Sequence, residues 1–378
     1  RLLDKELATR YGRDVSVSIN GTLVPLLDQA ENPNIMVCTL ADNPAQPGGW
    51  LNAGNLPVTR IDPELGRIVL ATGFGNNPAV TVAYHYGAAA VVGGGGYERD
   101  PATGAAPTEV PAADIGSHLA GLRAGGSLLI TDSGSASALP PLVVEAGATA
   151  VLAGANGHAP AFTDSETSIR LFPGTELVLD GLWIAGDVMV VKPESGSATL
   201  TLRDTTVRPG RKLSLVGPGL RLQLERSVVG ELRVDDDTDI DAVDSVIDAT
   251  ATGLLAIAGA NGGAGGSLSC QQTTIVGRVL VDQVGEISNS LIVAEGTNPG
   301  GEPAVVARRR QVGCVRHSYA PFESILPQRF RCVPAAAEDL DAPVFTSLRH
   351  GDAAYLQLDG RTPASIRTGS NEESEMGV

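Results

Sequence analysis

Short runs of alternating apolar and polar residues fill the chain, and Gly, Pro, Asn or Asp separates one run from the next. The run "VSVSINGTLVP" holds Asn20-Gly21 between β-forming residues, and "RIDPELGRIVL" places turn residues at 62–66 between two such runs. "AVTVAYHYG" alternates in the same way and stops at a glycine. These patterns predict two hairpins and a half-buried strand. We therefore expect a small antiparallel β domain over 1–92, with a short helix at 1–11.

The pattern then changes twice. Residues 93–113 are rich in Gly, Pro and Ala, which predicts a linker; its glycine run lacks the Lys-Ser/Thr ending of a phosphate-binding loop. "ADIGSHLAGLRAGG" predicts one short helix that ends at Gly125-Gly126. A helix at this point is suited to cap a stack of strands.

One short phrase recurs between Ser127 and Glu295: a polar residue, a small or hydroxyl residue, then bulky apolar residues. The spacing of its copies averages about 22 residues, which marks a solenoid. Leucine-rich repeats share this period, but they need a Leu-x-x-Leu-x-Leu frame that this chain lacks. The polar residues that open the phrase are Asp180, Asp204, Arg226, Asp244, Gln272 and Asn289.

Because each repeat consists of short β runs divided by turn residues, we predict an all-β chain whose main part, 114–300, is a parallel β-helix with an N-terminal capping helix. Right-handed coils follow from the usual hand of parallel β crossovers. The recurring polar residues then mark one corner of each coil, where side chains bond the turn backbone or stack in ladders. Residues 301–378 are expected to supply further strands, a cap and a mobile polar tail.

The run "VDDDTDIDAVD" is the most conspicuous candidate for binding chemistry. Asp235, Asp237, Asp239 and Asp241 alternate, so on a strand they would share one face and offer carboxylate oxygens to Ca²⁺. The run is no EF-hand loop, since Ile240 stands where that loop needs Gly. The alternative interpretation is a solvated acidic corner without a cation. No other cofactor is expected.

Enzymatic candidates are weaker. Asp180, Asp204 and Asp244 would serve a glycosidase if they lined one groove, but their recurrence at the repeat period favours turn chemistry. The basic residues at 203–212 near the acidic run suit a lyase only in an unspecific way. The five histidines lack metal-ligand spacing, and no G-x-S-x-G motif occurs.

Two further clusters have two interpretations each. Cys314 and Cys332 flank one segment and are candidates for a disulfide, or they are reduced thiols packed in the core. Arg308, Arg309 and Arg310 form a basic spot on an acidic protein, either as protection of a strand edge or as a docking contact for an acidic partner.

Composition limits the partners. The formal net charge is −16 among 378 residues, which disfavours nucleic acid and anionic membrane surfaces. Apolar runs are too short for a membrane span, and no secretory signal is visible, so we expect synthesis in the cytoplasm. Aromatic residues are scarce, which disfavours sugar stacking.

Two stretches carry a family resemblance. "RIDPELGRIVL…VTVAYHYG" and the C-terminal "RRRQVGCVRHSYAPFESILPQRFRC", "PVFTSLRHGDAAYLQL" and "SNEESEMG" resemble uncharacterised bacterial β-helix proteins associated with phage-tail-like contractile injection particles. The resemblance covers about a third of the chain. It implies a particle-associated structural role, no catalytic residues to carry over, and further chain after Val378.

Together these observations predict a non-catalytic structural or binding component, such as a spike, fibre or baseplate decoration. Its partners would be other proteins of an assembly or copies of itself, as a trimer or ring. A carbohydrate-active enzyme or lectin on a pectate-lyase-like β-helix, with a polysaccharide ligand, is the first alternative. A self-assembling surface or shell protein is the second.

Overall fold

The computed structural model describes residues 11, 15–27, 33–54, 56–62, 65–74, 78–84, 91–102, 106–136, 139–163, 166–296 and 301–378. The chain divides into two compact units. The first comprises 1–88 with 352–354, and the second comprises 89–351 with 355–378. The helix predicted at 1–11 lies outside the described residues, apart from Tyr11.

The first unit is built from two small sheets, whose orders are β2-β1-β6 and β3-β4-β5. Asn20-Gly21 forms the turn of the first predicted hairpin, with both residues at positive φ. The second predicted hairpin joins β4 and β5, whereas β3 pairs with β4 in parallel, so the unit is not wholly antiparallel. The strands are β1 (Val15–Ile19), β2 (Thr22–Leu23), β3 (Ile35–Val37), β4 (Thr59–Asp62), β5 (Arg67–Val69) and β6 (Val80–Tyr84).

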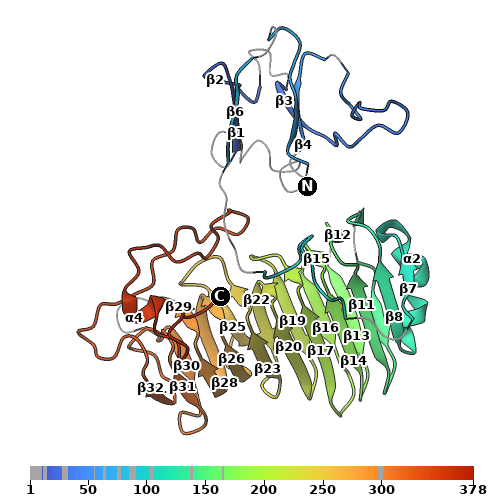
Figure 1. Cartoon of the computed structure of the whole chain (residues 1–378). Helices are drawn as coiled ribbons and strands as arrows, with labels where there is room; N and C mark the ends of the chain where they lie inside the picture. The colour runs from blue at the N-terminus through green and yellow to red at the C-terminus, as the bar shows by residue number, and fades with distance from the viewer. Residues whose placement is uncertain are drawn as a thin grey trace. The chain divides into compact units, whose positions relative to one another are not determined.

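The second unit is a parallel β-helix, as the repeat predicts (Figure 1). Each coil contributes strands to three faces, here called A, B and C. Face A contains β10 (Leu142–Val144), β13 (Thr167–Leu171), β16 (Val188–Val191), β19 (Lys212–Val216), β22 (Glu231–Val234), β25 (Leu255–Gly259), the start of β28 (Arg278–Ser288) and β30 (Val305–Ala307).

Face B follows face A along the chain in each coil. It contains β7 (Thr108–Val110), β8 (Gly126–Ile130), β11 (Thr149–Gly154), β14 (Glu176–Asp180), β17 (Ala198–Arg203), β20 (Leu220–Glu225), β23 (Asp239–Val243), β26 (Gly265–Gln271), the end of β28, β31 (Cys314–Arg316) and β32 (Gln328–Phe330).

Face C completes each coil with a short strand. It contains β9 (Ser135–Ala136), β12 (Ala161–Phe162), β15 (Trp183–Ile184), β18 (Thr206–Val207), β21 (Val228–Val229), β24 (Val246–Asp248), β27 (Thr274–Val276) and β29 (Leu291–Val293).

Strand alternation fills the interior with aliphatic side chains. In β20, for example, Leu222 points inward and is fully buried, and its parallel neighbours Leu200 and Ile240 are buried too. The intervening Arg221 and Gln223 point outward. Because side chains on a strand alternate between the two faces, in-register stacking of coils produces one continuous core that runs from Val110 to Cys332.

The predicted capping helix is present as three short turns at the first coil (Figure 1): η1 (Ala112–Asp114), α2 (Ile115–His118) and α3 (Ala120–Arg123). Ile115 and Leu122 are buried and join the core of the solenoid, so the helices cover the apolar end of the stack. Among the described residues, no helix has the length and apolar character needed to span a membrane.

The outer side of face C is covered by two segments of the same unit. Its outward side chains form one column in which Val228, Val246 and Leu291 are buried. Val92, from the start of the unit, and Leu356 pack on Val228 and Val246. Ile366, in α4 (Ala364–Arg367), packs on Leu291 together with Met376.

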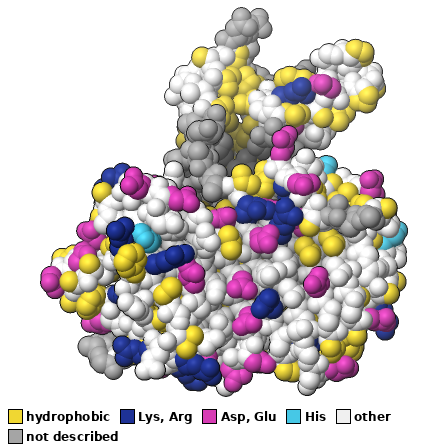
Figure 2. All heavy atoms as spheres, turned by 60° about the horizontal axis from the view of Figure 1, so that its bottom comes forward, with side chains coloured by type: hydrophobic (Ala, Val, Ile, Leu, Met, Phe, Trp, Pro, Cys, Tyr) yellow, Lys and Arg dark blue, Asp and Glu magenta, His cyan; other side chains and the backbone are white. Residues whose placement is uncertain are grey.

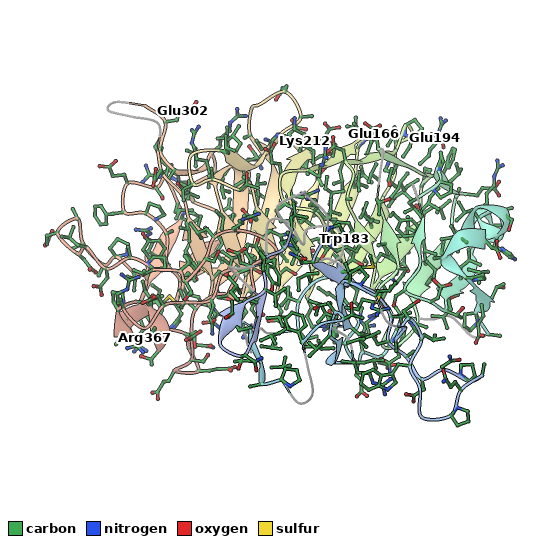
Figure 3. All side chains as sticks on the ribbon, turned by 90° about the horizontal axis from the view of Figure 1, so that it is seen from above. Glu166, Trp183, Glu194, Lys212, Glu302 and Arg367 are labelled. Carbon is green, nitrogen blue, oxygen red and sulfur yellow. The ribbon has the colours of Figure 1, made fainter. Side chains whose placement is uncertain are left out.

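Several charged side chains line one outer side of the solenoid (Figure 3). Figure 3 shows Glu166, Glu194, Lys212 and Glu302 along one side of the solenoid, and all four are exposed. On the face turned to the viewer in Figure 2, acidic and basic side chains are interspersed and no single sign dominates. Trp183 points outward in face C and is only partly buried, since the inward residue of that strand is Ile184.

Candidate functional site

The recurring polar residues stand where each coil turns from face B to face C. Asp204, Arg226, Asp244, Gln272 and Asn289 each follow the last residue of a face B strand and have φ between 44° and 50°. This left-handed conformation is rare outside glycine, and Asn and Asp tolerate it best. The column continues beyond the predicted copies, through His317 and Arg331.

Asp180 departs from this column. It pairs in register with Arg203, the residue before the corner, so Gly181 occupies the corner position of that coil with φ of 68°. The sequence pattern of a polar residue before a small one therefore assigns the corner to Asp180, whereas the corner residue of that coil is Gly181. Gly181 is suited to the left-handed corner because it has no Cβ.

The residue after each corner carries the repeated chemistry. Ser227 Oγ accepts a hydrogen bond from the backbone N–H of Thr205 in the preceding coil, at 3.2 Å, and donates to the carbonyl of Glu225, at 3.0 Å. Similar contacts recur in most of the following coils, so buried hydroxyls form a ladder inside this edge of the solenoid. Its members are Thr205, Ser227, Ser245, Thr273, Ser290 and Ser318.

Loss of one ladder hydroxyl should be measurable. Ser245 Oγ accepts from the N–H of Ser227, at 3.1 Å, and donates to Val243, at 2.7 Å. We expect Ser245→Ala to lower the free energy of unfolding by about 1–3 kcal/mol, because a buried N–H loses its acceptor. The partly exposed Ser267, on β26, is the control, and Ser267→Ala should change stability by less than about 0.5 kcal/mol. Equal effects in urea unfolding would contradict the ladder.

Aspartates of the acidic run accept hydrogen bonds from backbone N–H groups of the preceding coil. Asp235 and Asp237 lie in a turn between β22 and β23 rather than on a strand, so they do not share the predicted strand face with Asp239. Asp235 Oδ2 accepts from the N–H of Gly217, at 2.7 Å, and Asp237 Oδ2 accepts from that of Gly219, at 2.8 Å. Asp239 and Asp241 pair with Arg221. Among the described residues, no group of acidic, His or Cys side chains has the arrangement of a metal site.

The segment predicted as a linker is bound to the solenoid along residues 93–102, here called the strap. The N–H of Gly93 donates to the carbonyl of Arg226, at 2.7 Å, and the N–H of Gly94 donates to Thr206 Oγ1, at 2.9 Å. Gly94 lies so close to the coil that a Cβ there would stand 2.2 Å from the carbonyl oxygen of Leu182. The glycines therefore permit direct backbone contact with the corners.

Arg99 fastens the far end of the strap. Its guanidinium is buried beside Asp180, with Nε 3.6 Å from Oδ1, and their side chains are 3% and 0% exposed. Nη2 donates to the carbonyls of Gly154 and His158, each at 2.9 Å. Burial raises the pKa of Asp180, and this effect outweighs the N–H of Ala102 and the charge of Arg99, which lower it.

Tyr97, in the middle of the strap, binds a carboxylate that Arg226 also binds. Arg226 donates two hydrogen bonds of 2.8 Å to the buried carboxylate of Asp204, in the bidentate geometry that favours this pair. The hydroxyl of Tyr97 donates to the same carboxylate at 3.2 Å, and burial raises the pKa of that phenol. Two of the carboxylates considered for glycosidase chemistry, Asp180 and Asp204, are thus occupied by strap residues.

The C-terminal segment is bound in a similar way. Asn289, a corner residue, donates from its side-chain amide to Asn371 Oδ1, at 2.8 Å, and its Oδ1 accepts from the backbone N–H of Asn371, at 3.0 Å. The N–H of Val378 donates to Thr274 Oγ1, at 3.0 Å. The tail expected to be mobile is therefore hydrogen-bonded to the coils. Its polar composition suggests a solvated tail, but it supplies partners for the corner residue Asn289 and for Thr274 on β27, which are both buried.

Asp248 links this segment to the interior of a coil. Its carboxylate is fully buried and accepts from the hydroxyl of Tyr355, at 2.6 Å, and from the N–H of Thr250, also at 2.6 Å. Burial raises the pKa of Asp248, while both hydrogen bonds lower it. Desolvation therefore has the largest effect on the pKa of this carboxyl group.

This raised pKa predicts a pH effect on stability. Between the ordinary pKa of about 3.9 and the higher folded value, the folded state binds more protons, so Asp248 loses stabilising effect as pH rises through that window. We expect the stability of Asp248→Asn, relative to the parent, to increase with pH from about 4 upward. Tyr355→Phe should extend the loss to higher pH, because it removes a donor to the carboxylate. Parallel stability curves for parent and Asp248→Asn would contradict this.

The remaining predicted sites lie apart from the strap. All four cysteines are free thiols, so the predicted Cys314–Cys332 disulfide is not formed. Cys332 instead extends the hydroxyl ladder, with its thiol donating to the carbonyl of Val315, at 3.3 Å. The arginines at 308–310 are exposed in the turn after β30, and Arg309 pairs with Asp282 at 2.9 Å.

Comparison with known proteins yields no relative for this chain. No family model matches it, and neither a curated protein nor a solved structure is significantly similar.

Proposed function

We propose that the chain is a non-catalytic structural or binding component of a larger assembly, of the spike, fibre or baseplate-decoration type. The observation that carries this proposal is the strap. The N-terminal β unit continues into a segment that is held to several coil corners by hydrogen bonds and by the buried Arg99–Asp180 pair. A solenoid fastened in this way suits a carrier for an attached unit.

The architecture of the solenoid supports a role in which the protein bears mechanical load. Its coils share parallel ladders, a continuous aliphatic core and an inner hydroxyl ladder, so neighbouring coils stabilise one another. Two of the three carboxylates considered for hydrolysis, Asp180 and Asp204, hold the strap in place. Leu356 and Ile366, in the C-terminal segment, pack on outward side chains of face C. Phage-tail-like particles are the assemblies that the sequence resemblance suggests, and they remain part of this proposal.

The test is mass photometry combined with negative-stain imaging of the native protein recovered from its source. A discrete symmetric oligomer, or attachment to a tail-like particle, is the expected result. The double variant R308E/R310E tests the basic turn as the docking contact, and Arg123→Glu, on the exposed capping helix, is the matched control. A free monomer in every fraction and at every concentration would contradict the proposal.

A further inference from the structure

Face B carries a shallow depression on its outer side. It measures about 190 Å³ and is formed by β23, β26, β28 and β31. This is below the roughly 300–1,000 Å³ of typical small-molecule pockets. The space therefore suits one unit of a longer ligand that continues along the face. Its polar lining residues are Asp241, Ser269, Gln271, Glu286, Ser288 and Arg316.

The depression arises because side chains shrink along one outward column. Gln223 is followed in register by Asp241 and then by Ser269. In the next coil β28 has a bulge, and Gly285 lies under Ser269, where a Cβ would stand 2.4 Å from Ser269 Oγ. A bulge also redirects the next side chain, and here it leaves Glu286 pointing outward at the rim.

Each acidic side chain at the depression has a basic partner, although Asp241 shares Arg221 with Asp239. Glu286 pairs with Arg316, with Oε1 and Nη2 2.5 Å apart. Asp241 pairs with Arg221 at 3.9 Å. The planar groups of Gln271 and Arg316 add donors, while the carboxylates and serine hydroxyls add acceptors. A dense set of donors and acceptors with little net charge matches a ligand that is rich in hydroxyl groups and uncharged.

An aromatic side chain extends this surface. Phe330 follows Arg316 in register in the last coil and is 56% exposed. His317 packs edge-on against its ring, with centroids 5.8 Å apart, and the guanidinium of Arg331 lies 5.4 Å from it. These two neighbours fix the orientation of the ring. Neighbouring strands are about 4.8 Å apart, so Phe330 stands one strand beyond the depression.

We propose that this surface binds a neutral oligosaccharide or polysaccharide strand. One sugar unit occupies the depression and hydrogen-bonds to Asp241, Gln271 and Arg316. The apolar face of the neighbouring unit packs on the ring of Phe330, because aromatic side chains combine a large contact area with little entropy cost. The proposal goes beyond the structural role and does not depend on attachment to a particle.

The experiment uses the full chain in native affinity electrophoresis with the neutral polymers dextran, mannan and galactan, and with charged polygalacturonate and chitosan. Calorimetry then uses oligosaccharides of the retarding polymer. We expect a neutral polymer to retard the protein, and Phe330→Ala to weaken binding about tenfold. Ser269→Gln, which fills the depression, should abolish retardation.

Phe322→Ala is the matched control, because Phe322 is also an exposed phenylalanine, at 45%, but lies in a turn outside face B. It should bind as the parent does, and all variants should keep the parent's circular dichroism. The proposal is overturned if no neutral polymer binds, if only charged polymers bind, or if Phe322→Ala and Phe330→Ala lose affinity equally.

Discussion

Replacing Arg99 with alanine is expected to lower the free energy of unfolding of the solenoid unit by about 3–5 kcal/mol. The variant leaves the fully buried carboxylate of Asp180 without its cation and removes donors from the carbonyls of Gly154 and His158. Unpaired buried charges and acceptors are among the most destabilising changes in a folded protein. Urea unfolding followed by circular dichroism gives the measurement.

Arg123→Ala is the control for this result, since Arg123 and Glu145 form a 2.8 Å pair whose side chains are 63% and 51% exposed. Exposed pairs contribute at most about 1 kcal/mol. The cost of Arg99→Ala should also shrink at low pH, because Asp180, whose pKa is raised, then accepts a proton and is no longer an unpaired charge. A cost below that of Arg123→Ala would show that the strap is not fastened by Arg99.

The second large effect is a loss of stability that the in-register stacking of the coils predicts for a shortened core leucine. Leu222 is fully buried between Leu200 and Ile240 of the neighbouring coils, so Leu222→Ala should cost about 2–5 kcal/mol through lost burial and a residual cavity. The adjacent Gln223 points outward, and Gln223→Ala should cost less than about 1 kcal/mol, although it loses a bond from Thr201. The measurement is again urea unfolding, and a reversed order of the two costs would mean that the strand register is wrong.

Much of the fold follows from local patterns. Two-residue alternation and a recurring turn phrase are enough to predict stacked coils, because every coil meets the same demand to bury one side of each strand and to turn at the same corner. The hairpin at Asn20-Gly21 and the capping helix at Ile115 are predicted for similar local reasons. The ladder is present in the sequence as a Ser or Thr after most corners, but only the register shows that Ser227 and Ser245 point inward.

Local sequence patterns do not predict the long-range contacts of this chain. The strap has the composition of a linker, and its binding depends on where Arg99 meets Asp180, 81 positions later in the sequence. The depression on face B depends on the bulge at Gly285, which no periodicity marks. The alternating aspartates predict a strand at Asp235, whereas the adjacent run of polar residues forms a turn.

Hydrogen–deuterium exchange of the intact chain, resolved by peptide mass spectrometry, tests the central claim that both the strap and the C-terminal segment are fixed on the solenoid. Amides of Gly93, Ala102 and Gly377 donate to coil groups, so peptides over 93–102 and 371–378 should exchange far more slowly than unstructured chain, and Arg99→Ala should speed exchange in the first peptide. Exchange of both peptides within seconds, while the coil strands stay protected, would contradict the account.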